Sequence, residues 1–566
     1  MKSNLKEKIY KYLHNFRPWQ FSLLTACLFI FFIFLVGPLY SLFSKAFVNK
    51  AGAFVGWENY IKYFKNPALS VSVGNTFSIS LWATLFSVCI GFAYAYALTR
   101  TKIRGKEFFK YMAMIPIFIP TIVHALGLVY LFGKQGILTR AGLVSFELYG
   151  KIGIIISEVI YCFPQAFLMF LVALQFADGR LYEVADAMGI PAFKKLWYIT
   201  LPEIKYTLLN ACFVCFTLAF TDFGAPKVIG GSYNVLATDV YKQVAGQFNF
   251  NMGAVVGTLL LIPAVVSFIF DRLVTNRNAG SLTAKATTLV IKENKMRDAF
   301  FFGLCCLVTA FFLALIATLF LGGLVENYPY NLNLTLQNFN FSVSVGGLAS
   351  YFNSLKMALF TAIFGTIFVF IFAYLVEKTK GMRPLRYLAR LLSVIPMALP
   401  GLVVGISFIF FFNNRANPLN FIYGTVTILV ISNILHYFSV PFFTASGSLQ
   451  KLDKEFESVA DSMNIPRWKT LLKVSVPLAL SAILEIFMYL FVNAMVTVSA
   501  VAFLYSAKFR VASIAITHME EAGNFGQAAA MSILILLINV LVRIFYELAI
   551  HFLRKKAEKT TIVVQD

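Results

Sequence analysis

Residues 183–202 read EVADAMGIPAFKKLWYITLP, and residues 458–477 read SVADSMNIPRWKTLLKVSVP. Aligned without a gap, the two stretches share Val-Ala-Asp, Met, Ile-Pro, a central basic and aromatic segment, and the closing proline. They begin 275 residues apart in a chain of 566, so the chain reads as two fused halves. We call them the first and second repeated loops. A hydrophilic loop that occurs twice in an apolar chain indicates a docking surface for two copies of a soluble partner.

The composition around these loops is that of a membrane protein. The chain is 59% hydrophobic and 13% charged, with a mean hydropathy of +0.76. Apolar runs of about 20 residues, long enough to cross a hydrocarbon core of roughly 30 Å, recur along it. They lie at 21–46, 76–99, 110–132, 152–175, 206–225, 252–273, 300–323, 354–377, 387–412, 421–446, 478–504 and 528–552. The sequence therefore predicts an all-α, polytopic helical membrane protein with about twelve transmembrane helices.

The net charge of +22 follows this topology. With the N-terminus in the cytoplasm, the predicted inside segments hold about 34 of the 48 Lys and Arg residues. Short loops rich in Lys and Arg stay on the cytoplasmic side of a membrane. The charge therefore predicts that both termini and both repeated loops are cytoplasmic, and it argues against nucleic-acid binding. The basic flank 1–20 and the span after it are predicted to form an uncleaved anchor.

The duplication extends beyond the repeated loops. IPIFIP (115–120) matches IPMALP (395–400), and SEVIYCFP (157–164) matches SNILHYFS (432–439). Six spans in each half return the chain to the same side, so the halves are predicted to be two parallel six-helix repeats. The predicted parts are a first half at 1–273, a cytoplasmic linker at 274–299 and a second half at 300–566. The paired prolines interrupt helices inside the membrane, either as packing kinks or as part of a gate.

Within each repeated loop, the sequence predicts a short helix, a break and a second amphipathic helix. Gly189 can take the positive φ that such a break requires. Asn464 occupies the same place in the second loop and is the next most suitable residue there. Pro191 and Pro466 suit the first turn of the helix that follows. The expected product is a rigid projection on the cytoplasmic face.

The first repeated loop resembles the EAA loop of permease subunits of bacterial ABC importers. The residues that match that pattern at each spacing are Glu183, Ala185, Gly189, Ile199, Leu201 and Pro202. The second loop keeps Ala460 and Pro477 but has Ser458 in place of the Glu and Asn464 in place of the Gly. This departure suggests unequal coupling in the two halves.

The resemblance implies that each loop forms a coupling helix that docks on an ATP-hydrolysing subunit. The implied coupling residues are Glu183, Ala185, Asp186, Gly189, Pro191, Ile199, Leu201, Pro202, Ala460, Asp461, Asn464, Pro466 and Pro477. A plainer interpretation of one such loop is an amphipathic helix lying on the lipid surface.

No catalytic constellation is predicted. The segment GLVYLFGK (127–134) has five residues between its glycines and no preceding strand, so it does not fit a phosphate-binding loop. The five histidines are scattered, without metal-ligand spacing. We therefore expect a non-enzymatic chain that binds no cofactor and no metal, with ATP hydrolysed by a separate subunit.

Few charged residues fall inside the predicted spans, and such residues are functional candidates because their burial is costly. Asp222 is the preferred one, followed five residues later by Lys227. The pair either guides an anion or forms a structural ion pair. The corresponding uncharged segment of the second half carries Thr497 and Ser499, and these four residues form the predicted substrate pathway. Glu158 is expected near the outer interface.

The segment TDFGAPKVIGGSYNVLATDVYKQ (221–243) resembles fused permeases for 2-aminoethylphosphonate or ferric iron, and the aminoethylphosphonate members more closely. This resemblance implies a permease of a binding-protein-dependent ABC importer in a bacterial inner membrane. Its implied partners are two copies of a cytoplasmic ABC ATPase, an extracytoplasmic substrate-binding protein and the lipid bilayer. A phosphonate, ferric iron or a sugar phosphate remain the alternatives for the substrate. An ion-gradient-driven transporter with six-plus-six helices is the alternative of a different class.

Overall fold

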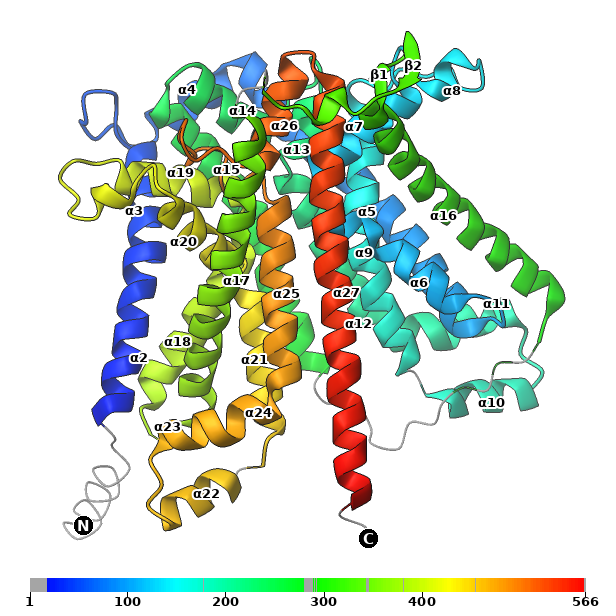
Figure 1. Ribbon diagram of the computed structural model, residues 1–566, viewed down its shortest axis with the longest axis vertical. Coiled ribbons are helices and arrows are strands. Elements are labelled where there is room, and N and C mark those ends of the chain that lie inside the picture. Colours follow the sequence, from blue (N-terminus) through cyan, green and yellow to red (C-terminus); the bar gives the residue numbers. More distant parts are fainter. Residues whose placement is uncertain are drawn as a thin grey trace. The chain divides into compact units, whose positions relative to one another are not determined.

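The computed structural model describes residues 18–176, 178–278, 289, 291, 293–342, 346–379, 381–453 and 455–563 (Figure 1). Helices account for nearly all of its regular structure, with one antiparallel hairpin of β1 (Val325–Asn327) and β2 (Asn331–Leu334). Among the described residues, eight helices are long and apolar enough to span a membrane, or up to eleven when each bent pair counts as one span. A shorter apolar stretch, Phe250–Val266, adds to these. The predicted all-α membrane fold is confirmed.

The chain divides into two compact units. Unit 1 takes its described residues from Met1–Ser44, Ala349–Ala512 and Leu536–Asp566, and unit 2 takes its own from Lys45–Leu348 and Ser513–Ile535. The predicted parts at 1–273, 274–299 and 300–566 concern the sequence repeat and stay a prediction, and part of the linker lies outside the described residues.

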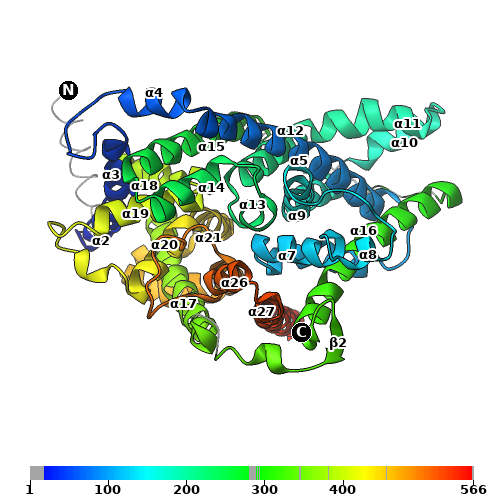
Figure 2. The same cartoon turned by 90° about the horizontal axis from the view of Figure 1, so that it is seen from above.

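Unit 2 is built around three long helices, α5 (Pro67–Arg100), α9 (Lys151–Gln175) and α12 (Leu201–Thr221), which lie side by side in Figures 1 and 2. Its other helices are α4 (Glu58–Lys65), α6 (Lys106–Met114), α7 (Thr121–Phe132), α8 (Ile137–Arg140), α10 (Gly179–Ala187), α11 (Ala192–Lys195), α13 (Gly224–Ile229), α14 (Leu236–Tyr241), α15 (Phe250–Asn278), α16 (Lys295–Leu324) and α26 (Ala512–Glu521). A Cβ at Gly91 of α5 would lie 3.0 Å from that of Ala166, so a missing side chain lets α5 and α9 approach closely.

Unit 1 has α2 (Pro18–Phe31), α3 (Gly37–Ala46), α17 (Gly347–Lys378), α18 (Arg383–Val394), α19 (Gly401–Phe412), α20 (Val426–His436), α21 (Ser439–Lys451), α22 (Glu455–Ser462), α23 (Arg467–Thr470), α24 (Val476–Leu478) and α25 (Leu480–Val496). The last helix, α27 (Phe525–Val563), contributes to both units. Phenylalanine rings cluster inside unit 1, with Phe31 and Phe438 edge to face at 4.7 Å and Phe372 and Phe442 beside them.

The first span of each half packs against helices of the other half. In unit 1, Phe31 of α2 contacts Phe438, and Phe34 stacks on Phe412 of α19. In unit 2, α16 packs against α5, α6 and α7, and the Thr309 hydroxyl lies 3.2 Å from the Tyr94 hydroxyl. The division of the chain by sequence repeat therefore differs from its division by packing at the first span of each half.

Three of the predicted spans are bent rather than straight. The span predicted at 387–412 turns by 111° between α18 and α19, at the segment IPMALP. Pro396 and Pro400 lack the N–H that a continuous helix needs, and a short 3₁₀ turn (Ile395–Ala398) replaces the α-helix between them. The span predicted at 421–446 bends by 58° between α20 and α21. The span predicted at 478–504 ends at Val496, and its helix bends by 78° from the one before it.

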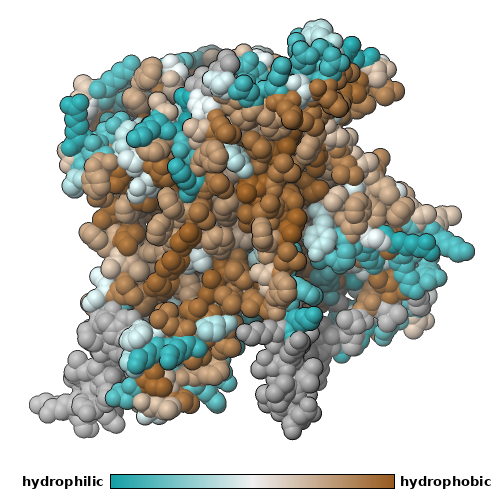
Figure 3. Space-filling model, viewed as in Figure 1, coloured by the Kyte–Doolittle hydropathy of each residue, from teal (hydrophilic) through white to brown (hydrophobic). Residues whose placement is uncertain are grey.

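Apolar side chains cover the exposed sides of these helices. Figure 3 shows hydrophobic residues along the visible helix surfaces, while hydrophilic residues gather toward the loops. Among the large apolar side chains, Phe364 and Ile367 of α17 and Leu307 of α16 are more than half exposed. Apolar residues exposed along such helices fit a hydrocarbon environment.

Candidate functional site

Both repeated loops fold as helix, break and helix. In the first loop, α10 ends at Ala187, and the Ile190 N–H donates to the Ala185 carbonyl at 2.9 Å across the break. Gly189 sits at the break with a φ of 67°, as the sequence predicts. This six-residue closure satisfies carbonyl groups that the end of the helix leaves open.

The second repeated loop has the same geometry. Its α22 ends at Ser462, and the Ile465 N–H donates to the Ala460 carbonyl at 2.8 Å. Asn464 has a φ of 52°, so it replaces the glycine in conformation as well as in position. Ala185 and Ala460 are both buried beneath their loops, which explains why each copy has a small side chain there.

The two prolines of the breaks lie one residue earlier than predicted. Pro191 and Pro466 are the N-cap residues of α11 and α23, with ψ of 153° and 136°, and not members of the first turn. The second helix of each loop is short and continues through a π turn toward the next span, over Leu196–Thr200 in one case and Leu471–Ser475 in the other. Ile199 lies in the first of these turns, and Leu201 and Pro202 begin α12.

In each loop, an ion pair links the helix before the break to the helix after it. Asp186 pairs with Lys195 in the first loop, and Asp461 accepts from the Arg467 guanidinium at 2.5 Å in the second. The aspartate is the same in both copies, but its cation comes from different positions of the following helix. The charge contact therefore holds the angle between the two short helices in each loop.

The outer faces of the two loops expose apolar side chains at matched positions. In the first loop, Met188 is 72% exposed and Phe193 is 70% exposed. Their equivalents Met463 and Trp468 are 67% and 53% exposed. Three further exposed pairs share this pattern: Val184 with Val459, Trp197 with Leu472, and Leu181 with Phe456 two residues before each loop. We call these five pairs the matched apolar face. Glu183 is exposed beside it. Contiguous apolar surface rimmed by polar residues is typical of a protein-binding site.

Asp222 lies at the end of α12, in contact with three other elements. Its carboxylate accepts from the Thr121 hydroxyl of α7 at 2.8 Å and from the Ala225 N–H at 3.0 Å. The Glu158 carboxyl group of α9 faces that of Asp222. Among the described residues, no backbone N–H, amide or hydroxyl donates to either Glu158 oxygen. Glu158 is 1% exposed, so its side chain lies inside unit 2, and its expected place near the outer membrane interface stays a prediction. We call the two residues the carboxyl pair.

Lys227 does not pair with Asp222. Its ammonium group lies 2.6 Å from the Glu521 carboxylate of α26 and 4.9 Å from the centre of the Tyr241 ring. The interpretation of Asp222 and Lys227 as an ion pair is therefore wrong. His518 lies 3.5 Å from the same carboxylate. The His518 and Lys227 contacts lower the pKa of Glu521 to about 2.

The place equivalent to the carboxyl pair in unit 1 is uncharged. Asn433 stands where the first half has Glu158, and Thr497 stands where it has Asp222. Asn433 donates to the Leu429 carbonyl at 2.9 Å, and both side chains are buried. The Ser499 hydroxyl lies where a Cβ at Gly401 would clash, just as Thr121 lies against Gly224 in unit 2. The two units thus share a backbone arrangement but differ in charge.

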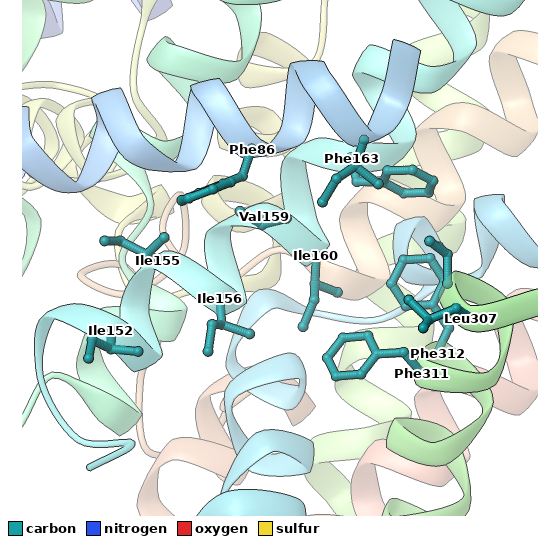
Figure 4. Close-up of a pocket in the computed structure, with 12 residues that line it drawn as sticks. Phe86, Ile152, Ile155, Ile156, Val159, Ile160, Phe163, Leu307, Phe311 and Phe312 are labelled. Atoms are coloured by element: carbon teal, nitrogen blue, oxygen red, sulfur yellow. The ribbon is translucent and has the colours of Figure 1, made fainter. Parts of the chain in front are cut away.

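A cavity of about 440 Å³ opens between α5, α9 and α16 of unit 2 (Figure 4). Isoleucines of α9, among them Ile156 and Ile160, face Phe311 and Phe312 of α16 across it. Every lining residue is apolar. The cavity suits a hydrocarbon chain and offers nothing to bind an ion, so it does not belong to the carboxyl pair.

The repeated loops, the bent spans and the apolar helices together define a membrane transport subunit. The sequence profile of the family described as the binding-protein-dependent transport system inner membrane component matches residues 87–279 and 371–555. The chain belongs to this family and carries its domain twice. It is therefore a multi-pass inner-membrane permease of a binding-protein-dependent ABC importer, and its family consists of transport components.

Three relatives show how the chain compares with known permeases. A Haemophilus influenzae protein named as a ferric transport system permease, FbpB 1, is 29% identical over 87% of this chain and 78% of its own length. The ferric transport system permease protein FbpB of Actinobacillus pleuropneumoniae is 27% identical over 93% of this chain and 77% of its own. The spermidine/putrescine permease PotC of H. influenzae is 24% identical and matches 46% of this chain with 98% of its own length. One such relative thus corresponds to one half of this chain.

Proposed function

We propose that this chain is the transmembrane channel of an ATP-driven importer for ferric iron. It receives the ion from an extracytoplasmic binding protein and releases it into the cytoplasm. Each repeated loop docks one copy of a cytoplasmic ABC ATPase, and both termini lie in the cytoplasm. ATP is hydrolysed on that separate subunit.

The duplicated loop carries the assignment to two ATPase copies. The matched apolar face has the same five positions exposed in both loops, on the same helix, break and helix geometry. A loop that lay on lipid would need apolar residues on one side, but it would not need the same rigid break twice. Two identical partners docking on two equivalent surfaces explain both features.

The choice of ferric iron is supported by the relatives and by the carboxyl pair. Two relatives that align with most of this chain are named as ferric permeases. Hard cations prefer oxygen ligands, which Asp222, Glu158 and Thr121 offer together. Lys227 is held by Glu521, so it is a poor attractor for a phosphonate. The relatives thus favour iron over 2-aminoethylphosphonate.

We further propose that the substrate passes the carboxyl pair in one half and the equivalent Thr497 and Ser499 in the other. The charged place would attract the cation. The neutral place would let it leave, because a site that holds its ion too tightly cannot conduct. Lys227 would act indirectly, by holding α26 beside α13.

The test is ATP hydrolysis in proteoliposomes that contain this chain, its ATPase and its binding protein. Ferric ion, 2-aminoethylphosphonate, inorganic phosphate and a sugar phosphate are added in turn. We expect the iron-loaded binding protein alone to stimulate hydrolysis and to drive iron uptake. Stimulation by one of the anions instead would overturn the substrate, and no stimulation by any of them would overturn the importer assignment.

A further inference from the structure

The second span of each half ends on a buried cation. α5 ends at Arg100, which is 6% exposed, and α17 ends at Lys378, which is 9% exposed. The repeat aligns these two residues, through TRTKIRG (99–105) and EKTKGMR (377–383). A cation at the end of a helix complements the helix dipole, but a buried charge also needs a direct partner. In each unit that partner is a residue of the repeated-loop helix.

In unit 2 the partner is an aromatic ring. The Arg100 guanidinium lies 5.0 Å from the centre of the Tyr182 ring, on α10. The Tyr182 hydroxyl is 2.8 Å from that of Thr200, in the π turn that leads into α12. The Arg100 Nε and Nη2 atoms have no hydrogen-bond acceptor among the described residues. A single buried ring therefore connects the end of α5, the helix α10 and the beginning of α12.

In unit 1 the partner is a carboxylate. The Lys378 ammonium lies 3.0 Å from Glu457, on α22, and donates to the Leu452 carbonyl at 3.1 Å. The Lys378 and Glu457 side chains are 6% and 8% exposed. One turn earlier on α17, the Tyr374 hydroxyl donates to the Arg467 carbonyl at 3.4 Å. Glu457 aligns with Tyr182, one residue before each repeated loop. The two equivalent residues therefore contact the end of the second span with different chemistry.

We propose that Arg100 with Tyr182, and Lys378 with Glu457, are positioning pairs that fix each repeated-loop helix to the second span of its half. A displacement of the loop by the ATPase then moves α5 or α17 as well as the span that follows the loop. This inference rests on the proposed docking of the ATPase. Because the two contacts differ, each predicts its own pattern of tolerated substitutions. The first needs a ring under a cation, and the second needs two opposite charges.

The experiment measures ATP hydrolysed per substrate imported, together with the affinity for the ATPase, in the full assembly. Breaking one side of a buried contact by Tyr182→Leu or Glu457→Gln should raise this ratio at least about 5-fold. ATPase affinity should stay within about 2-fold, since neither residue belongs to the matched apolar face. Tyr182→Phe keeps the ring, and Lys378→Arg keeps a cation opposite Glu457 at the end of α17, so both should keep the wild-type ratio.

The matched control is Lys102→Met. Lys102 follows α5 by two residues and pairs with Glu293, but its side chain is 47% exposed, so its loss should leave the ratio unchanged. A wild-type ratio in Tyr182→Leu and Glu457→Gln, or an uncoupled Lys378→Arg variant, overturns the proposal. Should Tyr182→Leu not insert, Arg100→Met tests the same contact, and a wild-type ratio there counts equally against it. Failure of the importer assignment is distinct, because the wild-type chain would then show no ATP-driven uptake.

Discussion

Gly189 and Asn464 stand at the same position of the repeat and share a left-handed backbone, with φ angles of 67° and 52°. Each lies at the break of its loop, after the last turn of α10 or α22. Asparagine is among the few residues with a side chain that adopt this conformation readily. The departure of the second loop from the glycine pattern therefore preserves its geometry.

The first prediction concerns this backbone. Gly189→Pro together with Asn464→Pro should uncouple uptake from ATP hydrolysis, because proline fixes φ near −65° and cannot adopt the break. Uptake should fall at least about 10-fold while the chain still inserts. Asn464→Gly is the control and should behave as wild type, since glycine adopts the same φ freely. Normal ATP-driven uptake by the double proline variant would contradict the role of the break.

The second prediction concerns the matched apolar face. Met188→Asp and Met463→Asp each place a charge on an exposed apolar surface. Each should weaken ATPase binding by about 10-fold, the effect of about 1.4 kcal/mol at a protein interface. The double variant should bind least, as measured by co-purification and by titration of the ATPase. Leu143→Asp is the control, because Leu143 is 72% exposed but lies outside both loops. An equal loss of ATPase binding in the three single variants would point to a general defect.

The third prediction concerns the carboxyl pair. Asp222→Asn should lower iron uptake by at least about 10-fold, because it removes an anionic oxygen that a hard cation would use. ATPase affinity should not change, since α12 reaches the repeated loop only at its other end. Thr121→Ala should have a smaller effect, because it removes one hydrogen bond to Asp222 and no charge. Uptake at the wild-type rate in Asp222→Asn would remove this residue from the substrate pathway.

The fourth prediction concerns pH and two neighbouring glutamates of α26. Burial and the charge of Glu521 raise the pKa of Glu520 to about 7. The folded protein then holds the proton of Glu520 more tightly than the unfolded chain does. The contribution of Glu520 to the free energy of unfolding therefore falls as the pH rises from about 4.5 to about 7, and it is constant above pH 7. Glu520→Gln should remove this fall and raise the melting temperature at pH 8, with no gain at pH 4.5.

Glu521→Gln is the matched comparison for that experiment. The pKa of Glu521 is lowered to about 2, so its carboxylate stabilises the fold at every pH above about 4.5. Its loss should therefore lower the melting temperature, and by less at pH 8 than at pH 5, because it also removes the charge that helps raise the pKa of Glu520. Melting curves of the detergent-solubilised chain across this range separate the two cases. A Glu520→Gln variant with the wild-type pH profile would assign the titration to another group.

The sequence predicts the membrane class, the repeat and the break of each loop, because these follow from local patterns. Apolar runs, Lys and Arg placement, and a glycine before Ile-Pro each report on nearby backbone. It also marks the segments IPIFIP and IPMALP as interruptions. The extent of the 111° bend between α18 and α19 is a property of packing, which the sequence alone does not give.

The contacts that sequence reasoning missed join residues that are far apart in the chain. An ion pair of Lys227 with its near neighbour Asp222 is one of two alternatives that the sequence suggests, whereas its partner Glu521 comes from a helix nearly 300 residues later. The contact of Glu158 with Asp222 does not follow from one charge in an apolar run. Arg100 and Lys378 looked like ordinary inside cations, although their burial beneath the repeated loops distinguishes them. The sequence signal for this role was that the repeat aligns Arg100 with Lys378, each at the end of a span.

The exchange of first spans has a consequence for how the chain is made. Phe31 of α2 packs on Phe438, and the nearby Phe34 packs on Phe412. Phe31 and Phe34 leave the ribosome long before these two partners have been synthesised. Chains grow at about 5–20 residues per second, so α2 must stay in the bilayer for tens of seconds without its packing surface. α16 meets no such delay, because α5, α6 and α7 precede it. Unit 2 can therefore be complete, except for α26 and the start of α27, before most residues of unit 1 have been synthesised. The two units thus assemble in a fixed order, although the two sequence repeats are equivalent.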